Sequence, residues 1–151
     1  MPEPGEYSDT LRVVGRWLQQ QGARNVEIID EGTHLGVSWE EPRGTQVKRL
    51  FRAFQLAQLR NEARLLRVDP DQDPGTTLAE TLRAIGDELD RLGHELLSII
   101  EDATGFRISA MAGGRHVIYG YSHEQIPDLI MKARARRRVR ARLPTGARPS
   151  R

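Results

Sequence analysis

The spacing of apolar residues predicts a helix near the start of the chain. Leu11, Val14 and Leu18 recur at the intervals that place side chains on one face of a helix. A Ser-Asp-Thr stretch, whose side-chain oxygens are suited to cap a helix N-terminus, precedes them. The pattern therefore predicts a helix over residues 9–21.

Strand and helix patterns follow in turn. Residues 26–30 are rich in β-branched side chains, and apolar residues alternate with small ones over 35–39, so the two segments predict a hairpin. Apolar positions over 46–67 recur at helical spacing on two different faces. We therefore expect a second helix over 46–67 that contacts two partners.

The strongest periodic signal lies in a run of aliphatic residues spaced alternately by four and three. This spacing is typical of an a/d seam and predicts one long helix over 77–103. The seam either packs inside the monomer or forms a homodimer interface, and the sequence leaves both open. Its candidate interaction residues are Leu78, Leu82, Ile85, Leu89, Leu92, Leu96 and Ile99.

A second hairpin and a last helix are predicted downstream. Alternating apolar residues at 106–110 and 117–121 flank a Gly-Gly pair, which is a strong signal for a tight hairpin turn. Apolar residues at helical spacing begin again at Ile126 and stop at Ala133. Beyond that point arginine and alanine, both good helix formers, extend the helical pattern.

These elements predict an α+β fold of two pseudo-symmetric αββα halves. A lone hairpin is marginal in water, so we expect the two antiparallel hairpins to join into one four-stranded sheet packed against helices. The halves would span 8–67 and 77–131, with an acidic Pro- and Gly-containing linker at 68–76. Together they would form a single domain over 1–131, followed by an Arg-rich helical extension and disordered tail at 132–151.

The charge distribution changes the picture of the C-terminus. The net charge is only +2, but residues 132–151 carry nine bases and no acid, so the rest of the chain has a net charge of −7. The basic pI near 9.4 is thus a property of one segment attached to an acidic body. Charge asymmetry of this kind is typical of an interaction tail.

Seven bases in this segment are the candidate polyanion-binding residues. Arginine binds phosphate bidentately, and each neutralised phosphate releases counterions, so such a segment would add salt-sensitive affinity without sequence preference. The alternatives are contact with the acidic helix of the same or a neighbouring chain, or no specific role. The candidates are Lys132, Arg134, Arg136, Arg137, Arg138, Arg140 and Arg142.

Catalytic and metal-binding patterns are weak. The chain has no cysteine, no phosphate-binding loop and no nucleophile-elbow motif. His34 and His116 would meet only if the hairpins adjoined suitably, where Asp30 would complete a metal site; surface histidines are the expected alternative. We therefore expect no catalytic residue, no metal and no cofactor.

The sequence as a whole indicates a non-enzymatic binding module. Its acidic body would serve as a protein-interaction or dimerisation platform, and its Arg-rich C-terminus would contact a polyanion, with DNA or RNA as the first candidate. The alternative is a protein–protein adaptor or chaperone-like dimer whose basic tail docks on an acidic protein surface. No apolar run is long enough to span a membrane, and a cytoplasmic location is the default expectation for a cysteine-free chain.

Overall fold

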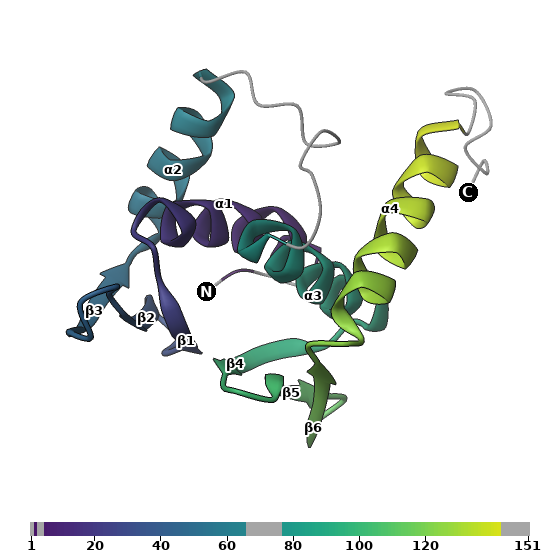
Figure 1. The fold of residues 1–151 in the computed structure, drawn as a ribbon. Coiled ribbons are helices and arrows are strands. Elements are labelled where there is room, and N and C mark those ends of the chain that lie inside the picture. The colour runs from purple at the N-terminus through teal and green to yellow at the C-terminus, as the bar shows by residue number, and fades with distance from the viewer. Residues whose placement is uncertain (1, 3–4, 66–76, 143–151) are drawn as a thin grey trace.

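A computed structural model describes residues 2, 5–65 and 77–142 of the chain. The predicted linker at 68–76 and the end of the predicted tail, residues 143–151, lie outside the described residues. Helices and strands follow the order α-β-β-β-α twice (Figure 1). In chain order they are α1 (Tyr7–Gln20), β1 (Arg24–Asp30), β2 (Leu35–Glu40), β3 (Gln46–Phe51), α2 (Ala53–Leu65), α3 (Leu78–Leu92), β4 (Glu95–Glu101), β5 (Gly105–Ala112), β6 (Arg115–Ser122) and α4 (Ile126–Arg142).

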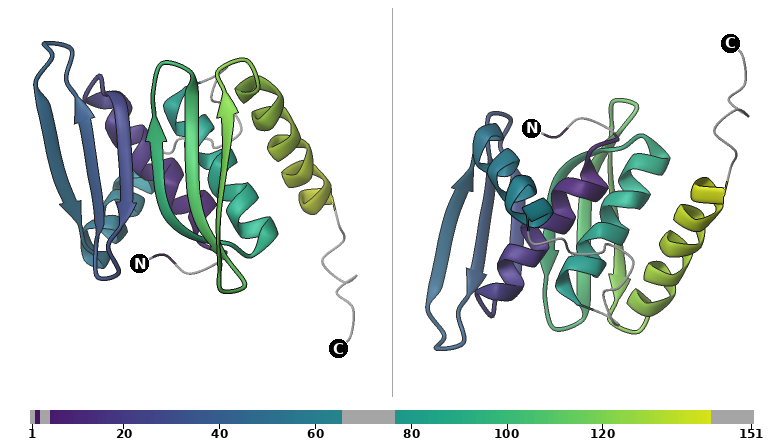
Figure 2. Two further views of the ribbon diagram at one scale, coloured as in Figure 1. Left: turned by 90° about the horizontal axis from the view of Figure 1, so that it is seen from below. Right: turned by 90° about the horizontal axis from the view of Figure 1, so that it is seen from above.

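The six strands form one antiparallel sheet in the order β3-β2-β1-β4-β5-β6 (Figure 2). The α+β class is confirmed, but the predicted four-stranded sheet is wrong because each half supplies three strands. The halves join where β1 pairs with β4. Ile28 lies opposite Ile99 at this junction, with one further residue pair on each side.

The predicted helix over 46–67 is in fact a strand followed by a helix. β3 pairs along its whole length with β2, from Glu40 opposite Gln46 to Leu35 opposite Phe51. This pairing buries Phe51 completely and leaves Val47 partly buried, so these two residues of the helical-looking stripe belong to the inner face of a strand, whereas Leu50 is 44% exposed. Helix α2 begins only at Ala53, which corrects the predicted αββα half to αβββα.

The predicted helix over 77–103 also divides into a helix and a strand. Helix α3 ends at Leu92, and Gly93 caps it with a left-handed φ of 68°. The chain then enters β4, where the register with β5 shifts between Leu96 and Ser98. This bulge places Leu96 and Ile99 on the same buried face, so a four–three spacing continues through two different elements.

Helices α1 and α3 cover one face of the sheet, and α2 and α4 flank them (Figure 2). Two glycines let α1 and α3 approach closely. A Cβ on Gly15 would lie 2.9 Å from the Cα of Ala79, and a Cβ on Gly86 would lie 2.6 Å from the carbonyl oxygen of Tyr7. Gly15 in α1 and Gly86 in α3 lie at the same position within their helices. The close approach between α1 and α3 is therefore repeated in the two halves, like the order of the elements.

The core lies between the two central helices and the inner face of the sheet. It is formed by the helix residues Leu11, Val14, Leu18, Leu82, Ile85 and Leu89 together with strand residues that include Val26, Ile28, Leu35, Val37, Ile99 and Ile108. Within the described residues, no helix is both long enough and apolar enough to cross a membrane.

All three tyrosines are packed against the inner side of the fold, so their ionisation is expected only at high pH. Burial is the main cause that raises the pKa of Tyr7, Tyr119 and Tyr121, and it raises that of Tyr119 to about 12. Since the neutral phenol is favoured in the folded state, this stabilisation is complete below the ordinary pKa of 10.0 and is lost as the pH rises through the raised value. In an ultraviolet titration, tyrosinate absorbance should therefore appear above pH 10.0 and accompany loss of the native circular dichroism. Half-titration at the ordinary pKa with native circular dichroism would contradict this packing.

Candidate functional site

The basic residues singled out from the sequence lie on α4, which packs beside α3. The side-chain carbonyl of Gln125 accepts a hydrogen bond of 2.9 Å from the backbone N–H of Ser122 and helps fix where the helix begins. Its first two turns are anchored by buried apolar side chains, Ile126, Leu129, Ile130 and Ala133. The predicted boundary between body and extension, at 131/132, thus falls inside one continuous helix.

Beyond Ala133 the described contacts between α4 and α3 are ionic. Glu80, in the first turn of α3, is only 1% exposed, and its carboxylate lies 3.5 Å from Arg83, 3.6 Å from Arg134 and 3.8 Å from Arg137. These distances are those of ion pairs rather than of close hydrogen bonds. A single buried carboxylate thus lies among three guanidinium groups, two of which come from α4.

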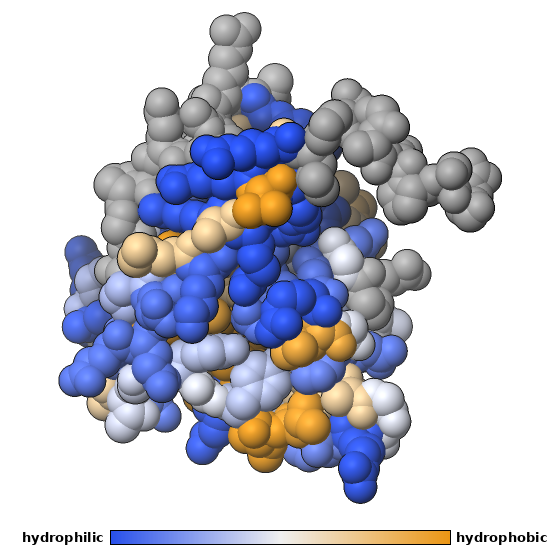
Figure 3. All heavy atoms as spheres, turned by 90° about the vertical axis from the view of Figure 1, so that its right-hand side faces the viewer, coloured by the Kyte–Doolittle hydropathy of each residue, from blue (hydrophilic) through white to orange (hydrophobic). Residues whose placement is uncertain are grey.

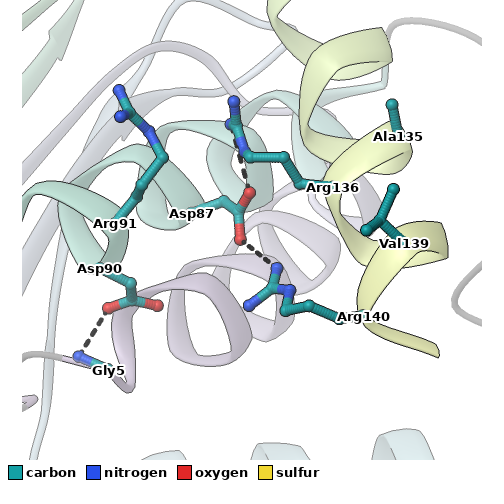
Figure 4. Close-up of a pocket in the computed structure, with 8 residues that line it drawn as sticks. All are labelled: Gly5, Asp87, Asp90, Arg91, Ala135, Arg136, Val139 and Arg140. Atoms are coloured by element: carbon teal, nitrogen blue, oxygen red, sulfur yellow. Dashed lines mark hydrogen bonds and ion pairs between the residues drawn. The ribbon is translucent and has the colours of Figure 1, made fainter. Parts of the chain in front are cut away.

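A second cluster lies two turns further along α3. Arg136 donates to the carboxylate of Glu88 at 2.7 Å. It also lies 3.4 Å from the carboxylate of Asp87, to which Arg140 donates at 3.2 Å (Figure 4). Arg91, on α3 itself, donates to Glu88 at 2.6 Å. We call Arg134, Arg136, Arg137 and Arg140 the inner arginines because they all contact carboxylates of α3.

The pKa of Glu88 reports the strength of this second cluster. Burial by itself would raise the pKa, but the hydrogen bonds and charges of Arg91 and Arg136 outweigh it and hold the pKa below its ordinary value. A lowered carboxyl pKa contributes stability that is present above the unfolded-state pKa and is lost as the pH falls through the folded-state pKa. The cluster therefore contributes at neutral pH and weakens in acid.

The remaining bases of α4, Lys132, Arg138 and Arg142, are exposed, and we call them the outer bases. Lys132 forms an exposed ion pair of 3.0 Å with Asp128, one turn earlier. Arg138 and Arg142 are exposed, and neither forms an ion pair with another residue in the described part of the chain. The surface on this side of the molecule is mostly hydrophilic, with apolar patches between the charged groups (Figure 3).

A groove of about 670 Å³ runs between α3 and α4. Its walls are formed by Asp87, Asp90 and Arg91 on one side and by Ala135, Arg136, Val139 and Arg140 on the other, with Gly5 at one end (Figure 4). Asp90 is already engaged, because its carboxylate accepts hydrogen bonds from the backbone N–H groups of Gly5, Tyr7 and Ser8 at 2.8–3.1 Å. Because Asp87, Arg136 and Arg140 also line the groove, solvent can reach the ion pairs between them.

The predicted interaction seam lies inside the monomer. Five of its residues, Leu82, Ile85, Leu89, Leu96 and Ile99, are buried in the core, Leu78 is packed against that core, and Leu92 is 44% exposed. A homodimer through these residues would require the core to open. The structure thus assigns the seam to packing within the chain, which was the alternative to an interface.

The structure keeps the histidines of the hypothetical metal site apart. His34 bonds to Glu31 and Thr33 beside β2, whereas His116 lies on β6 and bonds to Ser109. Three strands separate β2 from β6 in the sheet, so the condition for the hypothetical site, that the two hairpins adjoin at these histidines, is not met. No group of three or more metal-ligating side chains occurs among the residues that the structure describes.

Sequence reasoning identified the bases of α4 but missed their division into inner and outer rows. Contact with an acidic helix of the same chain was one of the alternatives, and four of the seven bases form ion pairs with α3. Comparison of the chain with protein families, curated proteins and solved structures finds no match.

Proposed function

We propose that this protein is a non-enzymatic binding module that contacts a polyanion, with nucleic acid as the candidate ligand, through the outer bases of α4. The observation that supports the proposal is the two-sided use of this helix. The inner arginines hold α4 against α3, while Lys132, Arg138 and Arg142 remain on an exposed side.

The side chains on the exposed side of α4 are better suited to bind phosphate groups than nucleobases. Arginine forms bidentate hydrogen bonds with phosphate oxygens, and a helix presents residues 138 and 142 on neighbouring turns of one side. No aromatic residue occurs on α4, so stacking with unpaired bases has no platform there. We therefore expect that the protein binds the phosphate backbone of the nucleic acid without preference for nucleotide sequence, and that its affinity falls steeply as the salt concentration rises.

Fluorescence anisotropy of labelled duplex DNA and of single-stranded RNA, titrated with the full chain across a salt series, tests this proposal. The double variant Arg138→Gln/Arg142→Gln should lower affinity about tenfold and reduce the slope of log K against log salt by about two, as expected for two lost phosphate contacts. A charge-matched control, Arg107→Gln/Arg115→Gln on the β5–β6 hairpin, should change neither quantity appreciably. Absence of binding at low salt, or an equal loss in the control, would show that the proposal is wrong.

A second candidate is a protein–protein adaptor, because the exposed side of α4 also carries an apolar stripe. Met131, Ala135 and Val139 follow one another at intervals of four, and Met131 and Val139 are 68% and 61% exposed. An apolar stripe beside arginines complements an amphipathic helix with acidic flanks, which is the partner that this candidate requires. Met131→Gln/Val139→Gln would then abolish binding of such an acidic peptide, whereas DNA affinity would be unaffected. The predicted chaperone-like dimer stays a prediction, which sedimentation can test.

A further inference from the structure

We infer that the carboxylates of Asp87 and Glu88 compete with the polyanion for Arg136 and Arg140, so that α3 lowers the affinity of α4 for its ligand. This inference rests on the proposed function and extends it. It adds two inner arginines to the ligand-contacting residues and assigns a restraining role to two acids that do not touch the ligand.

The two halves of α4 are anchored differently. Its buried apolar residues end at Ala133, and the nine residues that follow span about 13 Å of helix. Over that length, the described contacts with α3 are ion pairs of arginine with carboxylate. Ion pairs can be exchanged for other anions, whereas buried apolar contacts cannot, so the second half of α4 is the part that a polyanion can engage on both sides.

The arginines of the two clusters differ in their exposure. Glu80 is buried, and its arginine partners Arg134 and Arg137 have side chains that are 24% and 16% exposed. In the other cluster the side chains of Arg136 and Arg140 are 33% and 63% exposed. The carboxylates of Asp87 and Glu88 are themselves only 7% and 11% exposed, but their arginine partners are more exposed than those of Glu80, so a ligand reaches Arg136 and Arg140 first.

The groove between α3 and α4 makes the second cluster accessible to a ligand. The groove between α3 and α4 is lined by Asp87, Arg136 and Arg140, so a phosphate group can approach these ion pairs without any movement of the core. Phosphate and carboxylate use the same bidentate geometry on guanidinium, and only one of them can occupy a given pair of N–H groups. The structure places the Nη2 group of Arg136 and of Arg140 on these carboxylates, so a bidentate phosphate contact that uses Nη2 competes with them.

A double-mutant cycle measures this competition in the full chain with the labelled duplex DNA as probe. Asp87→Asn/Glu88→Gln should raise affinity about fivefold, the size expected for one or two partly exposed ion pairs. In an Arg136→Gln/Arg140→Gln background the same two substitutions should raise affinity less than twofold, because the arginines that they release are gone. Asp128→Asn, which removes an exposed acid of α4 itself, should have the same effect in both backgrounds.

The outcomes separate this inference from the proposed function. An equal gain in both backgrounds would mean that the acids act only through general repulsion, and the inference would be wrong while the proposed function stands. If no variant binds DNA, the proposed function fails instead. A measurement without ligand tests the restraint itself: Asp87→Asn/Glu88→Gln should speed amide hydrogen exchange over 134–142 and leave 126–133 unchanged. Unchanged exchange over 134–142 would overturn the inference.

Discussion

Gly86→Ala is expected to destabilise the protein by about 2–3 kcal/mol, despite the better helix propensity of alanine. A Cβ at this position would lie 2.6 Å from the carbonyl oxygen of Tyr7 and 2.7 Å from the backbone of Ser8. These are backbone atoms, and the carboxylate of Asp90 holds that stretch in place by accepting hydrogen bonds from the N–H groups of both residues. The helices α1 and α3 must therefore separate, which loosens the core beneath them.

Chemical denaturation of the purified chain checks this expectation. Gly36→Ala is the control, since the one tight contact of its Cβ would be with the far end of the Glu31 side chain at 3.1 Å, which can move, while the carbonyl oxygen of Ile29 lies at an ordinary contact distance of 3.8 Å. The control should change the free energy of unfolding by less than about 1 kcal/mol. Equal effects of the two substitutions would show that α1 and α3 do not cross as closely as described.

Glu80→Gln is the second substitution with a large expected effect, a loss of about 3 kcal/mol. The change preserves shape but removes the negative charge that lies among Arg83, Arg134 and Arg137. Three partly buried guanidinium groups would then repel one another without a counterion. We expect the free energy of unfolding to fall and α4 to lose protection from amide exchange along with it.

Two further variants test the electrostatic cause. Asp128→Asn breaks an ion pair whose carboxylate is 68% exposed and should cost less than about 0.5 kcal/mol. Adding Arg137→Gln to Glu80→Gln should restore part of the lost stability, because it removes one of the repelling charges. A double variant that is less stable than the sum of the two single effects would show that shape, not charge, governs this position.

The sequence predicts the elements well where one period belongs to one element. The first helix, the first hairpin and the start of α3 are of this kind. The prediction fails where a regular spacing crosses the boundary between two elements. Leu96 and Ile99 continue the four–three spacing of α3, but they lie in β4, where a β-bulge places both side chains on the buried face. The structure ends the helix at Gly93, whose left-handed φ of 68° suits glycine, although the four–three spacing continues across it.

The candidate site was predictable in composition but not in pairing. An excess of arginine and an acidic helix can be read directly from the chain. Which arginines turn inward depends on how α4 is rotated about its axis, and the buried residues Ile126, Leu129 and Ala133 determine that rotation. The β3 strand was missed for a related reason, since only its pairing with β2 shows that Phe51 faces the core.

The strand order carries a consequence for how the chain folds. Every neighbouring pair in the sheet except β1 with β4 is consecutive along the sequence, so each half can close its own three-stranded meander through short loops. The β1–β4 pairing joins residues 71 positions apart at Ile28 and Ile99, and it pays the largest loop-closure entropy in the sheet. Folding should thus be limited by the encounter of two locally formed halves rather than by strand formation within either.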